Sequence, residues 1–218
     1  MSDTPSATRK RPRRRRGNGG AEADGRAQII EAGIASILEV GFYRSSTNEI
    51  ARRANVSWGA LQYHFGTREA LLLAIVRDLD RSFLEDINAA HVEGETREER
   101  IASLYEILGR FYDTPTFLVR VQIILNLRHD PETSAEVSAE VTQHAARAEA
   151  STRRLLAEAI GPDASQSEYD ALFHALRGFA LSRQLSLAVP VKRSGAASRD
   201  ALQVFLRQLA SDGTRFEP

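Results

Sequence analysis

The sequence predicts an all-α protein of about nine helices, and three observations support this fold class. Apolar residues recur at the helical spacing of three and four positions, whereas no segment alternates apolar and polar residues as a strand does. Glycine and proline stand between the helical segments, where helices end. With 218 residues, 42% of them hydrophobic and 27% charged, the chain has the composition of a globular protein that buries a substantial core.

The first helix is expected from Asp24 to Val40. Gly41 follows as the residue that adopts a left-handed backbone at a helix end, and Phe42 lies where a Schellman motif packs an apolar side chain back on Ile37. The inward face of this helix shows the helical period and consists of Ile29, Ile30, Gly33, Ile34, Ile37 and Leu38.

Residues 46–65 (STNEIARRANVSWGALQYHF) predict two short helices around a tight turn. The first covers Thr47–Ala54, where Ser46 and Glu49 have the spacing of a capping box. Asn55 lies at the turn, because asparagine tolerates the left-handed backbone that such a turn needs. Two helices joined in this way can place the second helix in the DNA major groove. An ordinary helical hairpin in an all-α core is the alternative.

The second of these helices begins after its cap, Ser57, and ends near His64. Leu61 and Phe65 face inward. The outward face is a candidate for contacts with base edges and phosphates, and it carries Trp58, Gly59, Ala60, Gln62, Tyr63 and His64.

Six further helices are expected, and the first of them leads away from the helical pair after a break at residues 66–67. Their expected ranges are Arg68–Ala90, Arg97–Tyr112, Thr116–His129, Glu132–Ile160, Ser167–Val189 and Ser198–Ser211. We therefore divide the chain into a basic arm at residues 1–23, a helix-turn-helix domain at residues 24–68 and a larger helical domain at residues 69–218.

Positive charge is concentrated at the N-terminus. The first 20 residues hold seven basic side chains and one acidic side chain, which leaves 22 basic and 28 acidic side chains in the rest of the chain. Because the run RKRPRRRR has no apolar residue to bury, we expect this arm to be disordered in the free protein. Its candidates for following DNA phosphates or entering the minor groove are Arg13, Arg14, Arg15 and Arg16. A solvated tail that only raises non-specific affinity is the alternative.

Several classes of function lack their characteristic residues. The chain has no cysteine, which excludes disulfides, thiolate metal sites and cysteine catalysis and suits a reducing cytosol. No apolar run approaches the ~20 residues that span a bilayer, and none follows the basic N-terminus as in a signal peptide. The histidines are not spaced as metal ligands, and neither a glycine-rich phosphate loop nor a Gly-x-Ser-x-Gly motif occurs. We expect a cytoplasmic protein without catalytic activity, metal or cofactor.

The segment from Ile29 to Leu73 resembles the TetR/AcrR family of bacterial transcriptional regulators. The similarity lies in IIEAGIASILEVGF, STNEIARRANVSWGALQYHF and GTREALLLAI, and it covers about a fifth of the chain closely. The resemblance implies that the helix over Ser57–His64 enters the major groove. It also implies phosphate contacts for Ser46, Thr47, Tyr63 and Arg68. Trp58 replaces the family's usual lysine and Gln62 its usual tyrosine. Since glutamine can pair bidentately with adenine, these departures affect the expected operator sequence rather than the DNA-binding role.

Small residues form a stripe on the expected helix Ser167–Val189, where a second helix backbone can approach closely. They recur at spacings of four, three and four positions and are Ala171, Ala175, Gly178 and Ser182. The last helix offers the apolar residues Leu202, Phe205, Leu206 and Leu209. The resemblance implies that these two helices of each subunit form a four-helix dimer interface, whereas packing within one subunit is the alternative.

A ligand pocket is also implied by the resemblance, on the helices between the DNA-binding domain and the dimer helices. The candidate lining residues are Phe83, Ile87, Leu104, Leu108, Phe111, Phe117, Val121, Ile124, Leu125, His174 and Arg177. The apolar members all have helical spacing, so ordinary core packing is the alternative for most of them. A cavity lined in this way would favour a mostly apolar ligand with one polar or anionic group.

These features together predict a homodimeric repressor that binds a pseudo-palindromic operator in double-stranded DNA. A small, mostly apolar effector would release it from that operator, and no membrane partner is expected. A non-specific or architectural DNA-binding protein that relies on the basic arm is one alternative. A helical enzyme or ligand carrier that has lost DNA binding is another.

Overall fold

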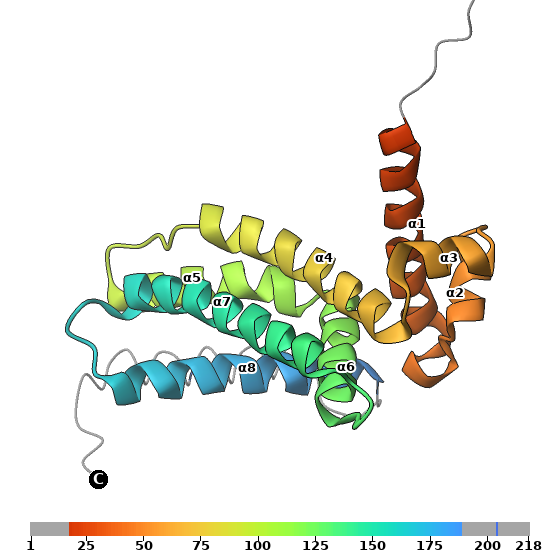
Figure 1. The fold of residues 1–218 in the computed structure, drawn as a ribbon. Coiled ribbons are helices and arrows are strands. Elements are labelled where there is room, and N and C mark those ends of the chain that lie inside the picture. The colour runs from red at the N-terminus through yellow and green to blue at the C-terminus, as the bar shows by residue number, and fades with distance from the viewer. Residues whose placement is uncertain (1–17, 189–203, 205–218) are drawn as a thin grey trace, which may run out of the picture.

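The computed structural model describes residues 18–188 and Val204, and these form helices and loops without any strand. The all-α prediction is therefore confirmed for the described residues. The elements in chain order are α1 (Asn18–Val40), the 3₁₀ helix η1 (Phe42–Arg44), α2 (Thr47–Arg53), α3 (Trp58–Phe65), α4 (Arg68–Ala89), α5 (Arg97–Tyr112), α6 (Pro115–His129), α7 (Ala135–Ile160) and α8 (Gln166–Ala188) (Figure 1). The expected arm residues 1–17 and nearly all of the expected helix at residues 198–211 lie outside the described residues.

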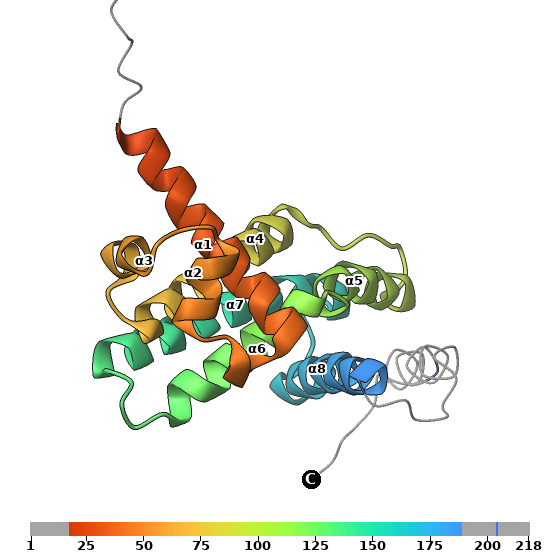
Figure 2. The same ribbon diagram turned by 90° about the vertical axis from the view of Figure 1, so that its right-hand side faces the viewer.

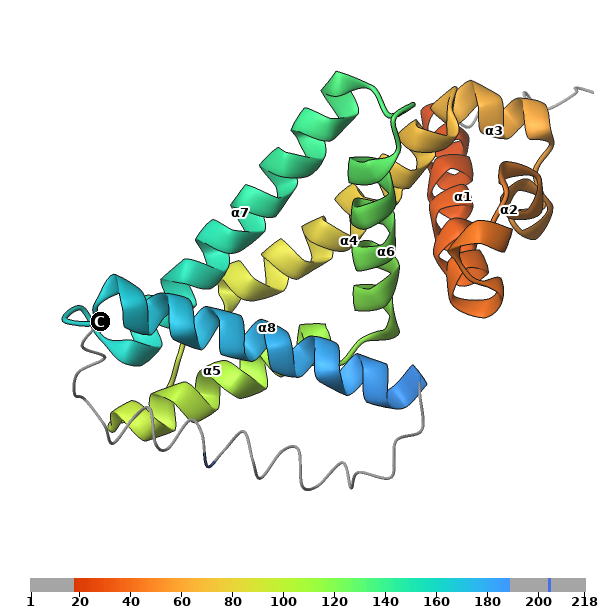
Figure 3. The same cartoon turned by 90° about the horizontal axis from the view of Figure 1, so that it is seen from below.

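The helices form two groups that α4 connects. Helices α1, α2 and α3 gather at one end, and α4 runs from them into a bundle with α5, α7 and α8 (Figures 1 and 3). Helix α6 crosses this bundle close to the first group, where it contacts both α1 and η1 (Figure 3). The N-terminal helices are therefore attached to the rest of the molecule through α4 and through α6.

One hydrophobic core lies beneath the N-terminal helices and continues into the bundle. Its centre is formed by Ile29 and Ile50 on α1 and α2, Leu61 on α3 and Ile75 on α4, all nearly inaccessible to solvent. Helices α6 and α7 complete the same core with Val119, Ile123, Leu127 and Val141. The core under the predicted helix-turn-helix domain thus includes side chains from far beyond residue 68.

A second hydrophobic core lies between α4, α5, α7 and α8. It includes the buried side chains Phe83, Ile87, Leu104, Leu108, Leu155, Leu156, Leu172 and Leu176. The end of α4 is tied to α7 by Arg154, which donates hydrogen bonds to the carbonyls of Ile87 at 2.6 Å and Ala90 at 3.0 Å. These bonds satisfy carbonyl groups that the end of a helix leaves without an intrahelical partner.

Two helix starts differ from the sequence prediction by three residues or more. Helix α1 begins at Asn18 rather than Asp24, and the strong helix formers in the segment Ala21–Ala23 favour this extension. Helix α7 begins at Ala135 rather than Glu132, because Ser134 caps it by accepting a hydrogen bond from the Val137 amide at 3.3 Å.

Gly41 ends α1 with the positive φ of 83° that was predicted, but its ψ of 162° is extended rather than left-handed helical. The Schellman prediction is therefore wrong: the Gly41 amide makes an ordinary helical hydrogen bond to the Ile37 carbonyl at 3.1 Å, and η1 follows directly. Among the described residues, no helix is both long enough and apolar enough to cross a membrane.

Candidate nucleic-acid interface and adjoining cavity

The helical pair at residues 46–65 has the local geometry that the sequence predicts. Ser46 caps α2 by accepting a hydrogen bond from the Glu49 amide at 3.2 Å, and Ser57 caps α3 by accepting one from the Ala60 amide at 3.1 Å. Asn55 has φ 53° and is the one non-glycine residue with positive φ in the described part of the chain. The turn thus uses the left-handed asparagine that was predicted.

One face of helix α3 packs against the hydrophobic core, and the opposite face is exposed to solvent. Leu61 is buried and Phe65 packs partly against the same core. The side chains of Trp58 and Tyr63 are 55% and 75% exposed, and Gln62 is exposed between them. Figure 2 shows α3 beside α1 and α2 at the edge of the molecule. This face therefore offers an indole, an amide and a phenol to a partner.

The other predicted DNA-contact residues vary in accessibility. Ser46, Ser57 and Gly59 are exposed, whereas Thr47 and Ala60 are half-buried. His64 is half-buried beside α1, where its Nε2 lies 3.4 Å from the position that a Cβ atom on Gly25 would occupy. The four arginines Arg13 to Arg16 lie outside the described residues.

Arg68 makes contacts that the sequence analysis missed. Its guanidinium donates hydrogen bonds to the carbonyls of Ser45 at 2.6 Å and Phe42 at 3.4 Å, and it lies 5.2 Å from the centre of the Phe42 ring. Burial lowers the pKa of this guanidinium, because the charged form loses hydration. Arg68 therefore fastens the start of α4 to the loop that precedes α2, and its phosphate contact stays a prediction.

The predicted capping box at α2 forms only in part. The Glu49 carboxylate accepts hydrogen bonds from Arg52 at 2.8 and 2.9 Å and from Arg53 at 2.6 Å, rather than from the backbone of Ser46. Charged donors form stronger hydrogen bonds than a neutral amide, which explains this exchange. Arg53 also pairs with Glu39, so the cluster joins α2 to α1.

We expect the Glu49 cluster to make stability depend on pH. The hydrogen bonds from Arg52 and then Arg53 lower the pKa of Glu49 from 4.5 to about 2. Because this pKa is depressed in the folded protein, the contribution of Glu49 is complete above pH 4.5 and is lost as the pH falls towards 2. Thermal unfolding of the wild type and the Glu49→Gln variant should differ at pH 7 and converge near pH 2. The exposed Glu85→Gln serves as the control, and a difference that does not change with pH would contradict this role.

The predicted stripe of small residues lies on the outer side of α8. Ala171 and Ala175 are half-buried, and Gly178 and Ser182 are exposed. A Cβ atom built on Gly178 would meet nothing within 4 Å. The opposite side of α8 carries the buried Leu172, Leu176, Ala180 and Gln184. The other predicted dimer residues, Leu202, Phe205, Leu206 and Leu209, lie outside the described residues.

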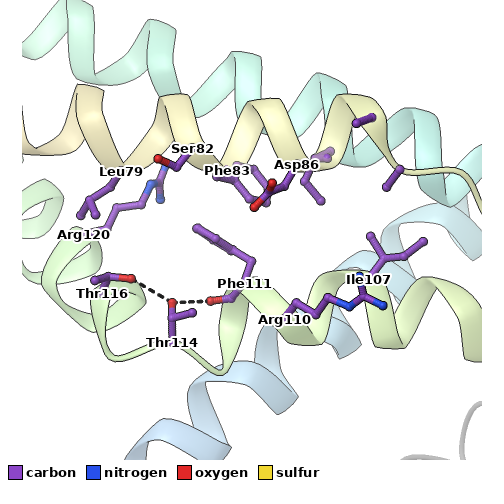
Figure 4. A pocket seen from close by; sticks show the side chains of 13 residues that line it. Leu79, Ser82, Phe83, Asp86, Ile107, Arg110, Phe111, Thr114, Thr116 and Arg120 are labelled. Atoms are coloured by element: carbon purple, nitrogen blue, oxygen red, sulfur yellow. Dashed lines mark hydrogen bonds between the residues drawn. The ribbon is translucent and has the colours of Figure 1, made fainter.

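A cavity of about 490 Å³ opens between α4, α5 and α6 (Figure 4). Three of the candidate pocket residues, Phe83, Ile87 and Phe111, line it, and the rings of Phe83 and Phe111 lie 4.0 Å apart between their centres. Its remaining lining residues are Leu79, Ser82, Asp86, Ala89, Ala90, Ile107, Arg110, Thr114, Thr116 and Arg120. The cavity thus has aromatic and aliphatic walls with an arginine from each of two helices.

The structure does not bring the other predicted pocket residues to this cavity. Leu104, Leu108 and Phe117 are buried in the protein interior, and Val121 and Ile124 are half-buried on α6. Leu125 is 52% exposed, and His174 and Arg177 are exposed on α8. Their role in a ligand pocket therefore stays a prediction, because helical spacing identifies an inward face but not the neighbour that covers it.

A buried group of charges beside the cavity was not found from the sequence. Asp80 on α4 is fully buried, and its Oδ1 accepts a hydrogen bond from Nε of Arg120 on α6. His144 on α7 places Nδ1 3.4 Å from Oδ2 of Asp80 and Nε2 3.6 Å from Oε1 of Glu140. Arg77 on α4 pairs with Glu140. We call these five residues the Asp80 cluster. In the described part of the chain, no three acidic or histidine side chains are arranged to hold a metal ion.

The N-terminal part of the chain is similar to known proteins of the family that its motifs resemble. Residues 29–75 match the family model described as bacterial regulatory proteins, tetR family. The HTH-type transcriptional regulator BetI of Brucella anthropi is 35% identical over 88 residues, which cover 40% of this chain and 45% of that protein. BetI of Cronobacter sakazakii is 37% identical over 90 residues, 41% of this chain and 44% of that protein. The chain therefore matches slightly less than half the length of these curated relatives.

Solved structures show the similarity over most of the fold. A transcriptional regulator from Rhodococcus sp. Rha1 has a TM-score of 0.63 at 18% identity, covering 85% of this chain and 96% of that chain. The regulator FadR of Bacillus subtilis, solved with stearoyl-CoA, has a TM-score of 0.61 at 19% identity, covering 87% and 99%. The multidrug binding protein EbrR, solved with ethidium, has a TM-score of 0.57 at 23% identity, covering 85% and 98%. These similarities establish the fold.

Proposed function

We propose that this chain, whose N-terminal segment matches the tetR family of bacterial regulatory proteins and whose fold is similar to that of a TetR family member, is a homodimeric repressor. It binds a pseudo-palindromic operator in double-stranded DNA, and a small, mostly apolar ligand releases it.

The exposed face of α3 is the observation that carries the proposal. A capped helix with one buried side, and with polar and aromatic side chains on the other, is suited to enter the major groove. Trp58, Gln62 and Tyr63 provide this outward surface, while Leu61 fixes the helix against α1 and α2. Ser46, Thr47 and Arg68 stand at the starts of the neighbouring helices, where backbone amides and hydroxyls meet phosphates.

Substitutions on α3 should separate base recognition from phosphate contact. Gln62→Ala should relax the preference at one base pair by about 1–3 kcal/mol, because it removes a bidentate amide. Tyr63→Ala should weaken binding to all duplexes alike, because a phosphate contact carries no sequence information. Fluorescence anisotropy with matched and singly mismatched duplexes measures both effects. If Gln62→Ala weakens all these duplexes equally, the base contact assigned to Gln62 is wrong.

Dimerisation follows from the limited reach of one recognition helix. A single α3 contacts few base pairs, whereas a two-fold dimer sets two such helices in successive major grooves, roughly 34–36 Å apart. The outer face of α8 supports this arrangement, since Gly178 leaves space there and Leu181 and Leu185 add exposed apolar surface.

The cavity provides a physical route from ligand to DNA. Leu79, Phe83 and Ile87 place one wall of the cavity on α4, and α4 begins at Arg68 directly after α3. A ligand that binds one arrangement of α4 more tightly shifts the population towards that arrangement. Two proteins of similar fold were solved with ethidium and with stearoyl-CoA, which supports a partly apolar ligand for this cavity.

Selection of bound duplexes from a random DNA pool, at near-physiological salt, tests the proposed function. Enrichment of a pseudo-palindrome with half-sites about one helical turn apart is the expected result. Recovery of DNA without a shared motif would favour the architectural alternative, and a protein lacking residues 1–17 would then lose most of its binding. Recovery of no DNA would contradict DNA binding by the unliganded protein.

A further inference from the structure

We propose that Arg120 anchors the anionic head group of an amphipathic ligand, and that binding of this ligand is coupled to proton uptake by His144. The inference rests on the proposed function in one respect: it takes the cavity between α4, α5 and α6 as the effector site. It adds the charge class of the ligand, the residue that selects it and a dependence of ligand affinity on pH.

Arg120 belongs both to the cavity and to the Asp80 cluster. It lines the cavity together with Leu79 and Ser82, and its side chain reaches from α6 towards α4 (Figure 4). Nε of Arg120 is bound to Asp80, and within the described residues its two terminal nitrogens make no further hydrogen bond or ion pair, although its charge also acts on the buried Tyr112. A guanidinium held through Nε still has a fork of donors that suits a carboxylate or phosphate.

The chemistry of the walls defines the rest of the ligand. Phe83, Ile87, Ile107 and Phe111 form apolar surface beyond the position of Arg120. Arg110 on α5 and Asp86 on α4 also line the cavity, and both are exposed, so water screens their charges. The cavity therefore suits a ligand with an apolar chain or ring that packs on the phenylalanines and an anionic group that pairs with Arg120.

The Asp80 cluster is electrically balanced without a proton on His144. Arg77 and Arg120 supply two positive charges, and Asp80 and Glu140 supply two negative charges. Helices α4, α6 and α7 bring these four residues and His144 into ion-pair distance, and Tyr112 at the end of α5 is a further titratable group that interacts with Arg120. A ligand anion at Arg120 would leave one excess negative charge beside the fully buried Asp80, which is costly at low dielectric.

Protonation of His144 would return the net charge of the Asp80 cluster and the bound anion to zero, and the added charge would lie next to Asp80. Oδ2 of Asp80 and Nδ1 of His144 are buried, lie 3.4 Å apart and have no hydrogen-bond partner. A proton on His144 makes both ring nitrogens donors, one facing Asp80 and the other facing Glu140. The proton comes from solvent, and no covalent bond other than this N–H forms or breaks. The ligand anion and the proton therefore favour each other's binding.

Isothermal titration calorimetry with dodecanoate and with dodecanol tests the proposal. The two probes have the same chain length and differ in head-group charge. Titrations between about pH 6 and pH 9, in buffers of different ionisation enthalpy, report the protons taken up, because histidine is the side chain that most often changes charge near neutral pH. We expect dodecanoate to bind about tenfold or more tightly than dodecanol and to take up as much as about one proton.

Three variants assign the effect to residues. His144→Asn leaves a neutral donor beside Asp80 and should abolish proton uptake, whereas His174→Asn, on exposed α8, should retain it. The double variant Asp80→Asn, Arg120→Gln removes one charge of each sign and should lose the preference for dodecanoate over dodecanol. The proposal is supported if all three variants behave as expected.

Other results overturn the proposal. They are heats independent of the buffer, proton uptake that persists in His144→Asn, equal affinity for the two probes, or no binding of dodecanoate up to its solubility limit. Because the DNA selection uses the unliganded protein, its result tests the proposed function independently of the proton-coupled ligand binding. A protein that selects a palindrome but shows none of these ligand effects keeps the proposed function and loses this inference.

Discussion

Replacing Arg120 with methionine should lower the free energy of unfolding by about 3–5 kcal/mol. Methionine fills a similar volume but leaves the carboxylate of Asp80, which has no exposed surface, without its strongest partner. Breaking a buried pair from one side costs this much because the remaining charge stays desolvated. Urea unfolding followed by circular dichroism at pH 7.5 measures the change.

Two comparisons show whether burial is the cause. Asp80→Asn combined with Arg120→Gln removes both charges and should cost clearly less than Arg120→Met alone. Arg52→Met breaks a pair with Glu49 on an exposed part of α2, where solvent screens both charges, and should be clearly less destabilising than Arg120→Met. If Arg120→Met is no more destabilising than Arg52→Met, the Asp80 cluster is not important for stability.

Gly178→Leu should dissociate the proposed dimer. A Cβ atom at this position meets no atom within 4 Å, so one protomer accommodates the new side chain without strain. In a two-fold interface built on the small stripe of α8, two copies of the leucine would face the same close helix contact. Overpacking costs about 1–3 kcal/mol for each side chain, or about 2–6 kcal/mol for the dimer. Sedimentation equilibrium would then show monomers at concentrations where the wild type is dimeric.

The control is a leucine of the same size on another surface. Ala146 is exposed on α7, and Ala146→Leu should leave the association state unchanged. Urea unfolding of the Gly178→Leu protomer should remain cooperative, since glycine is the poorer helix former. Association unchanged by Gly178→Leu would place the dimer interface elsewhere.

The sequence predicts those features that depend on neighbours in the chain. Ser46 and Ser57 cap their helices, and Asn55 adopts positive φ at the turn, because capping and turn geometry involve residues within a few positions. The ends of α4 and α5 also agree closely with the prediction, because capping residues and helix-breaking loops bound them. For α1 the end was predicted but the start was not, since helix propensity extends it beyond the apolar stripe.

Contacts between distant segments could not be predicted in this way. Asp80, Arg120 and His144 lie on three helices, and nothing in their local sequence indicates that they meet. Arg68 was assigned to phosphate by resemblance, yet the packing of α4 on the loop before α2 gives it two carbonyl partners. The predicted cavity residues divide for the same reason, because Phe111 and Leu108 share a helix and pack on the same core but only Phe111 also lines the cavity.

The continuity of the first core limits how this protein can be recombined with others. Val119, Ile123 and Leu127 on α6 complete the core beneath Ile29, Ile50 and Leu61. A chimera that exchanges only the first three helices would set a foreign surface against α6 and expose or crowd these side chains. Transfer of the DNA specificity to another effector domain therefore requires the contacting face of α6 to be transplanted as well, so the unit of exchange is discontinuous in sequence.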